Sequence, residues 1–256
     1  MQMKKNLWNY LALSLFTLFA IVVILSCFKF IKVFANNEIS DKLGDWSDYS
    51  TCLAALFTFV SLTFIYLTYK KQSDSNYKLQ FDSTFFNMLH TQREILASFE
   101  KGYFIERLER IEMEHSTSWS EEITERQALA IVNGAYIQSK IGYYDNTIMH
   151  YFRHLYHIIK LIHNSSFDNE KQREYVDIIQ AQMSNEELFV MFYNVISYNN
   201  REYIKWLDDY HFFENVRSSG TLFDKIKKIF FKKTVFKYNA STPNNNLLDL
   251  DTTKNP

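Results

Sequence analysis

Residues 7–28 read LWNYLALSLFTLFAIVVILSCF and residues 49–69 read YSTCLAALFTFVSLTFIYLTY, and neither run contains a charged side chain. An α-helix rises about 1.5 Å per residue, so each run is long enough to cross a hydrocarbon core of about 30 Å. Only residues 29–48 separate the two runs. The sequence therefore predicts a transmembrane hairpin of two helices. The alternative is a cleaved secretory signal or lipidation at Cys27, because Ile24-Leu25-Ser26-Cys27 resembles a lipoprotein cleavage box.

The composition predicts that the rest of the chain is helical. Only 2 prolines and 5 glycines occur in 256 residues, whereas an all-β chain needs turn residues at short intervals. The expected fold class is all-α, with the two-helix hairpin followed by a cytoplasmic helical-bundle domain. We expect the hairpin over 1–71, the helical domain over 72–217, a basic amphipathic segment over 218–238 and a disordered tail over 239–256.

The distribution of lysines predicts the orientation of the hairpin, since basic residues near the ends of spans favour the cytoplasmic side. Five lysines lie before the first span or after the second, and three lie in the loop between the spans. They are Lys4, Lys5, Lys70, Lys71 and Lys78 against Lys29, Lys32 and Lys42. We therefore expect a multi-pass protein with both termini in the cytoplasm. Neither span has an intramembrane charge, so neither resembles an ion pathway.

Both cysteines of the chain belong to the hairpin. Cys27 lies near the end of the first span and Cys52 near the start of the second. Antiparallel spans would bring them to a similar depth on the outer side, where a disulfide can form. The alternative is two unpaired thiols facing lipid. The cytoplasmic part has no cysteine, and therefore no thiolate nucleophile or cysteine-based zinc site.

Apolar residues after the hairpin recur at helical spacing, and Ser/Thr–Glu pairs mark helix starts. The first helix, over 81–100, could directly continue the second span. A basic amphipathic segment ends the periodic part of the chain. The expected helices are 81–100, one within 103–117, one from a capping box at Ser118 and Glu121 to Ile141, 145–163, 170–183, one from a capping box at Ser184 and Glu187 to Ile196, and 201–216.

Three histidines share one face of the 145–163 helix: His150, His154 and His157. Pairs at this spacing can chelate a metal ion, but three ligands in a row on one helix converge poorly on a tetrahedral ion. The favoured interpretation is a polar helix face opposite the buried stripe of Ile148 and Leu155. We expect no cofactor.

The segment 221–238 alternates lysines with apolar residues. In a membrane-anchored chain this pattern predicts contact with anionic headgroups. The residues expected at the membrane surface are Lys225, Lys228, Lys232, Phe230 and Phe231. The alternative is a solvated helix that caps the core. Contact with nucleic acid is a third and weaker option, and nucleic acid is not an expected partner of the chain.

Several aromatic-rich motifs resemble one family. They are Gly44-Asp45, FDSTFFNML at 81–89, YFRHLY at 151–156, YVDIIQAQMS at 175–184, Glu187-Leu188 and Phe192-Tyr193-Asn194. Together they are similar to the AbiC-like family of phage abortive infection proteins, over roughly residues 40–215. The chain departs from the family pattern at Gln180, where the pattern has an arginine. The resemblance implies antiviral defence at the bacterial inner membrane and supplies no catalytic residues.

Three functions stay open from the sequence. The favoured one is a membrane-anchored defence effector or sensor without an enzymatic site, with a phage component as trigger and the bilayer as partner. The second is a HEPN-like ribonuclease, for which Arg110 and His115 have suitable spacing for acid–base chemistry on RNA. The third is a structural protein that docks other defence components or forms a homo-oligomer.

Overall fold

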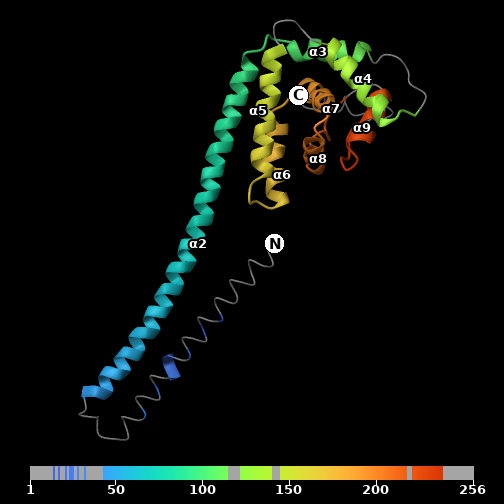
Figure 1. The fold of residues 1–256 in the computed structure, drawn as a ribbon. Coiled ribbons are helices and arrows are strands. Elements are labelled where there is room, and N and C mark those ends of the chain that lie inside the picture. The colour runs from blue at the N-terminus through green and yellow to red at the C-terminus, as the bar shows by residue number, and fades with distance from the viewer. Residues whose placement is uncertain are drawn as a thin grey trace, which may run out of the picture. The chain divides into compact units, whose positions relative to one another are not determined.

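The computed structural model describes residues 43–114, 122–139, 145–217 and 221–238, together with Ser14, Thr17, Ile21, residues 23–25, Phe28 and Lys32. These residues are helical or lie in turns and short irregular connections (Figure 1). The all-α prediction is thus confirmed for the part of the chain that is described. Most of the first predicted span lies outside it, as does Cys27. The chain divides into two units, Met1–Tyr77 and Lys78–Pro256, and each is treated below by itself.

Helix α2 (Leu43–Ala97) is 55 residues long. It includes the second predicted span, the polar stretch at 70–80 and the predicted 81–97 helix without interruption. No proline or glycine occurs between Gly44 and Gly102, so nothing in this sequence breaks the helix. The polar stretch at 70–80 is therefore a helical segment.

One helix of the described residues is long and apolar enough to cross a membrane, by length and composition alone. It is the part of α2 from Leu53 onward, and its apolar window has no buried residue. This finding agrees with the second predicted span. The two-helix hairpin, the multi-pass topology and the cytoplasmic position of the termini stay predictions.

The second unit contains the end of α2 and seven further helices within the described residues (Figure 1). They are α3 (Tyr103–Glu114), α4 (Glu125–Gln138), α5 (Asp145–His163), α6 (Asn169–Gln180), α7 (Asn185–Tyr198), α8 (Arg201–Asp209) and α9 (Thr221–Phe230). The predicted range of α5 is confirmed. Its predicted stripe is also buried, as Ile148, Leu155 and Ile159 are each at most 1% exposed.

Helix α7 occupies the centre of the second unit. Every residue from Glu187 to Ile196 is buried, so the helix has no exposed face over that length. A helix that is buried all round must be covered by other elements, and α7 contacts α3, α4 and α8. The ring of Phe192 lies 4.8 Å from Phe223 and 5.3 Å from Phe231, measured between ring centroids. Helix α9 and the residue after it therefore complete the cover.

Capping boxes fix the starts of two helices. The predicted box at Ser184 and Glu187 is confirmed at the start of α7, where each side chain bonds the other residue's backbone N–H. Helix α4 begins at Glu125 with a second box between Thr124 and Gln127. The start predicted from Ser118 and Glu121 was wrong, and those two residues lie outside the described part. The T-x-x-Q spacing at 124–127 is the sequence pattern that indicates the start of α4.

Helix α8 ends at Asp209, well before the predicted end at residue 216. His211 has a φ of 54°, which lies in the left-handed region. This conformation turns the chain, and the amide of Phe212 donates to the carbonyl of Leu207 at 2.9 Å. The turn buries Phe212 and Phe213, which are both fully inaccessible.

After α9 the chain forms a non-helical C-terminal segment, residues 231–238. Phe230 at the end of α9 is 6% exposed and Phe231 is 2% exposed, because both rings pack into the core. These two rings are not on the surface where headgroup contact was expected. Lys228 and Lys232 are exposed and Lys225 is half-buried. Packing of α9 on the core agrees with the alternative of a helix that caps it.

Candidate functional site

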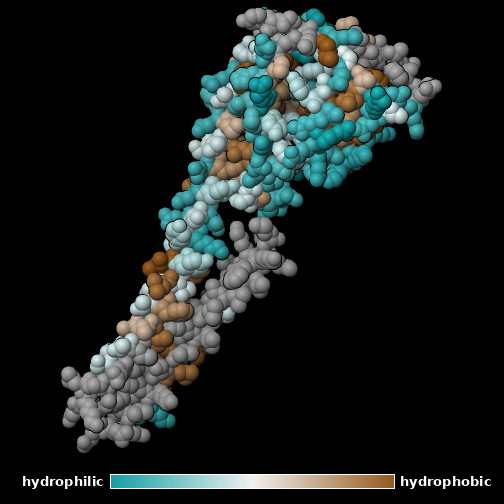
Figure 2. Space-filling view, in the orientation of Figure 1, coloured by the Kyte–Doolittle hydropathy of each residue, from teal (hydrophilic) through white to brown (hydrophobic). Residues whose placement is uncertain are grey.

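Large apolar side chains are exposed along residues 53–69 of α2, which we call the apolar stretch. Figure 2 shows it as hydrophobic surface on this helix. The side chains are 43% to 71% exposed and project in all directions around the helix axis, which is typical of a helix surrounded by lipid. They are Phe57, Phe59, Leu62, Phe64, Ile65, Tyr66, Leu67 and Tyr69.

Two threonine hydroxyls of the apolar stretch are satisfied within the helix. Thr58 donates from Oγ1 to the carbonyl of Ala54 at 2.8 Å, and Thr63 donates to the carbonyl of Phe59 at 2.9 Å. A hydroxyl in hydrocarbon needs such a partner because no water is available there. These two threonines therefore need no partner outside the helix.

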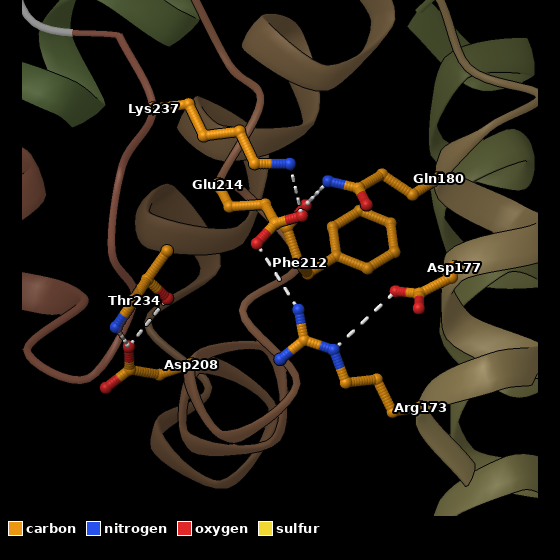
Figure 3. Close-up of polar contacts among 8 residues, drawn as sticks. All are labelled: Arg173, Asp177, Gln180, Asp208, Phe212, Glu214, Thr234 and Lys237. Atoms are coloured by element: carbon orange, nitrogen blue, oxygen red, sulfur yellow. Dashed lines mark hydrogen bonds and ion pairs between the residues drawn. The ribbon is translucent and has the colours of Figure 1, made fainter. Parts of the chain in front are cut away.

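A network that we call the polar clamp joins α6, the end of α8 and the C-terminal segment in the second unit (Figure 3). Glu214, in the turn after α8, lies at its centre. One carboxylate oxygen of Glu214 is 3.3 Å from a terminal nitrogen of Arg173, and the other accepts from Nζ of Lys237 at 3.0 Å. Arg173 also approaches Asp177 at 3.8 Å. The members of the polar clamp are Arg173, Asp177, Gln180, Asp208, Glu214, Thr234 and Lys237.

Gln180, the position that departs from the family pattern, takes part in the polar clamp. Its side-chain amide donates to the carbonyl of Phe212 at 2.9 Å (Figure 3). The amide is buried, and the carbonyl belongs to the tight turn that follows His211. Gln180 therefore supplies the donor that this turn needs in a place where water is excluded.

Asp208 binds the C-terminal segment in the same clamp. One oxygen of its buried carboxylate accepts from the amide of Thr234 and from the Thr234 hydroxyl, each at 2.8 Å. It also accepts from the amide of Lys233 at 3.0 Å. These backbone contacts hold a segment that has no secondary structure of its own. Every carboxylate in the polar clamp has a hydrogen-bond donor or a cation as its partner. The polar clamp therefore stabilises the fold.

A second buried network links α2, α5 and α7. The hydroxyl of Tyr151 donates to a carboxylate oxygen of Glu187 at 2.7 Å, and the Gln92 amide donates to the Tyr151 carbonyl at 3.3 Å. Burial raises the pKa of the Glu187 carboxyl above its usual value, although the bonds from Tyr151 and Ser184 act in the opposite direction. Burial and the nearby Glu187 also raise the pKa of Tyr151. Sequence reasoning identified Glu187 as a capping residue but missed its bond to Tyr151.

Arg107 of α3 is buried among α3, α4 and α7, with 1% of the residue exposed. Its guanidinium donates to the Tyr103 hydroxyl at 2.9 Å and lies 4.6 Å from the ring centroid of Tyr136. The Tyr136 hydroxyl in turn accepts from the amide of Asn194 at 2.6 Å. Burial raises the pKa of Tyr136 to about 12, against the opposing effect of Arg107. No pattern in the sequence singled out Arg107.

The histidine row lies where the sequence placed it. His150 and His157 are exposed, and His154 is half-buried with Nδ1 at 2.8 Å from Oε1 of Gln92. Burial lowers the pKa of His154, and the two neighbouring histidines lower it further. Among the described residues, no three His, Cys, Asp or Glu side chains are grouped so that they could hold a metal ion.

Of the two residues of the ribonuclease hypothesis, Arg110 and His115, only Arg110 belongs to the described part of the chain. Arg110 is partly exposed and lies 2.5 Å from a carboxylate oxygen of Glu106, one turn earlier in α3. His115 lies outside the described residues. Cys52 belongs to α2, but nothing in the structure tests its pairing with Cys27. The ribonuclease and disulfide hypotheses therefore stay predictions.

The described features define a helical protein with one candidate membrane helix and a second helical unit built around α7. A family model described as "Putative phage abortive infection protein" matches residues 143–219. The match covers α5 to α8 and the turn that carries Glu214. It bears out the resemblance found in the sequence over this segment. No curated protein and no solved structure matches the chain.

Proposed function

We propose that this protein is a membrane-anchored anti-phage defence protein of the abortive infection type, acting at the bacterial inner membrane as an effector or sensor without an enzymatic site. The observation that carries the proposal is an exposed apolar stretch in a chain whose 143–219 segment matches the abortive infection family. Exposed apolar surface of this extent is unfavourable in water and indicates contact with a membrane, which is where the proposed defence protein acts.

In this proposal the hairpin holds the helical unit on the cytoplasmic side. A phage component triggers the response, and the partners are the bilayer and either further copies of the chain or another defence protein. The polar clamp and the network around Glu187 hold the shape of the helical unit. Neither network carries out chemistry on a substrate in this view, since their groups are satisfied by one another.

The anchor is tested by placing a charge in the apolar stretch. Phe59→Arg puts a guanidinium near the middle of the predicted span, at a cost of about 2.5–3.5 kcal/mol for insertion. Phe86→Arg is the matched control, because Phe86 lies on the same helix, is also exposed and is outside the apolar stretch. We expect Phe59→Arg, and not Phe86→Arg, to lower the membrane-bound fraction of the protein and phage protection together.

Two further variants separate the alternatives in the same phage challenge. The Arg110→Ala/His115→Ala double variant should protect as well as the wild type, and loss of protection with normal membrane binding would favour the ribonuclease. A chain without residues 1–71 should not protect. Full protection by that shortened chain would contradict the membrane-anchored function.

A further inference from the structure

Three lysines of the second unit form an exposed cationic surface that we call the basic ridge: Lys205 of α8, Lys228 of α9 and Lys232 of the C-terminal segment. All three are exposed, and none has an ion pair with a described residue. Lys228 and Lys232 are four residues apart, and the amide of Phe231 still bonds the carbonyl of Lys227, so they lie near one another. The two lysines share the outward side of this element.

Contacts between α8 and the end of α9 place Lys205 beside them. The guanidinium of Arg201 lies 6.0 Å from the ring centroid of Phe230, and the amide of Lys233 donates to Asp208. Helix α8 thus runs alongside residues 230–233, and Lys205 lies between its two points of contact. Arg201, Lys205 and Asp209 are all exposed and share one face of α8, because they follow one another at intervals of four residues.

The carboxylates around the ridge are occupied by other groups. Asp208 accepts backbone amides, Asp209 pairs with Lys233, Asp224 pairs with Lys227 at 2.7 Å, and Glu214 pairs with Arg173 and Lys237. Arg201 is itself paired with Glu125. The exception is Glu202, which is exposed and lies one turn before Lys205 on the same side of α8, although no ion pair joins these two side chains. Three lysines against one exposed carboxylate leave the ridge with a net positive charge.

We propose that the basic ridge binds anionic lipid headgroups by charge alone, without inserting apolar side chains. The inference rests on the proposed function, because the apolar stretch keeps the chain at a bilayer and so gives the lipid surface a high effective concentration. Phe230 and Phe231, which would insert if the segment behaved as an amphipathic membrane helix, are buried in the core. The contact is therefore peripheral and sensitive to salt.

Lipid is favoured over nucleic acid by the state of the nearby rings. Single-stranded nucleic acids bind through exposed aromatic faces that stack on bases. The ring of Tyr238 is covered by the guanidinium of Arg217 at 4.2 Å, and that of Phe236 faces Nζ of Lys227 at 4.6 Å. The two rings of the C-terminal segment that are not buried in the core thus each face one of the protein's own cations. A positively charged surface that has no free aromatic ring for base stacking is suited to a layer of anionic headgroups.

The test uses the full chain reconstituted in nanodiscs of phosphatidylcholine alone or of phosphatidylcholine mixed with phosphatidylglycerol. Acetylation of each lysine by an amine-reactive reagent is followed by mass spectrometry. We expect the labelling of Lys205, Lys228 and Lys232 to fall several-fold in the anionic discs and to recover at high salt. Labelling of Lys101, which is exposed outside the ridge, should not change.

A charge-neutralised variant gives an independent measurement. Amide exchange of residues 221–238 should slow in anionic discs for the wild type, but not for Lys205→Gln/Lys228→Gln/Lys232→Gln. The control Lys101→Gln/Arg126→Gln/Lys160→Gln loses the same charge elsewhere and should behave as the wild type. Unchanged exchange in α5 and α7 shows that both variants are folded.

The same experiments distinguish failure of the ridge inference from failure of the proposed function. If the chain inserts into both discs and the ridge lysines are labelled equally in each, the inference is overturned and the anchor stands. If the chain enters neither disc, the proposed function fails and the inference falls with it. If added RNA protects the ridge in neutral discs as well as phosphatidylglycerol does, the ridge is a nucleic-acid surface and the lipid assignment is wrong.

Discussion

Glu187 is a buried carboxyl group that serves two purposes at once. It completes the capping box of α7 with Ser184 and accepts the Tyr151 hydroxyl at 2.7 Å. Its raised pKa means that the native state binds the proton more tightly than the unfolded chain does. The stability linked to this group is therefore fully present below the unfolded pKa, and it is lost as the pH rises through the folded pKa.

Replacing Glu187 by glutamine removes the charge and keeps one acceptor oxygen for the amide of Ser184, while the glutamine amide can donate to the Tyr151 hydroxyl oxygen. We expect Glu187→Gln to raise the free energy of unfolding at neutral pH by about 1 kcal/mol, because a buried charge no longer has to be accommodated. Its stability should also vary less with pH than that of the wild type. Chemical denaturation at acidic and neutral pH measures both effects.

The control for this prediction is Glu186→Gln, since Glu186 is the neighbouring carboxylate in the first turn of α7 and is less buried. It should be neutral or slightly destabilising, because it loses only a favourable interaction with the helix N-terminus. If Glu187→Gln destabilised the protein at neutral pH, the buried carboxylate would have to be favourably bound in its charged form.

At the scale of elements, helical periodicity predicted best where a helix has one buried face. The buried stripe of α5 and the start of α7 were predicted correctly because a 3.6-residue repeat and a capping box are local signals. The end of α8 was missed, because the left-handed residue there is His211 and not a glycine. The burial of Phe230 was missed as well. A helix that lies on a membrane surface and a helix that packs on a protein core have the same sequence pattern of lysines alternating with apolar residues.

The burial of α7 predicts a large effect at its centre. Phe192→Ala should destabilise the protein by about 3–5 kcal/mol, because the fully buried ring leaves a cavity between α7, α9 and the C-terminal segment. Phe86→Ala, at an exposed ring of α2, should change stability by about 0.5 kcal/mol or less. Thermal or denaturant unfolding of the two variants in the same detergent makes the comparison.

The C-terminal segment depends on Asp208. Asp208→Ala removes the acceptor of two backbone amides and one hydroxyl, so it should cost about 2–3 kcal/mol and speed amide exchange over residues 231–238. Asp209→Ala breaks only an exposed ion pair with Lys233 and should cost less than about 1 kcal/mol. Equal exchange of the segment in both variants would show that Asp208 does not hold it.

At the scale of the whole molecule, composition alone indicated helices, since so little proline and glycine occurs. The polar clamp and the Arg107 cluster could not be predicted, because their partners are far apart in the sequence. Glu214 and Arg173 are separated by 41 residues, and Tyr136 and Asn194 by 58. Their pairing follows from how the helices pack, which no short pattern encodes. The basic ridge became visible only when most of the carboxylates near it proved to be paired with other groups.

The central position of α7 also constrains the order in which a growing chain can mature. The apolar stretch of α2 leaves the ribosome early, long before residues 221–231 have been synthesised. Until those residues emerge, Phe189 and Phe192 lack the rings of Phe223 and Phe231 that cover them. We therefore expect helices α5 to α8 to form an incompletely packed intermediate with exposed apolar side chains until residues 221–231 have left the ribosome. A released chain truncated at residue 219 should bind chaperones and be cleaved rapidly, and a released chain that ends beyond residue 238 should not.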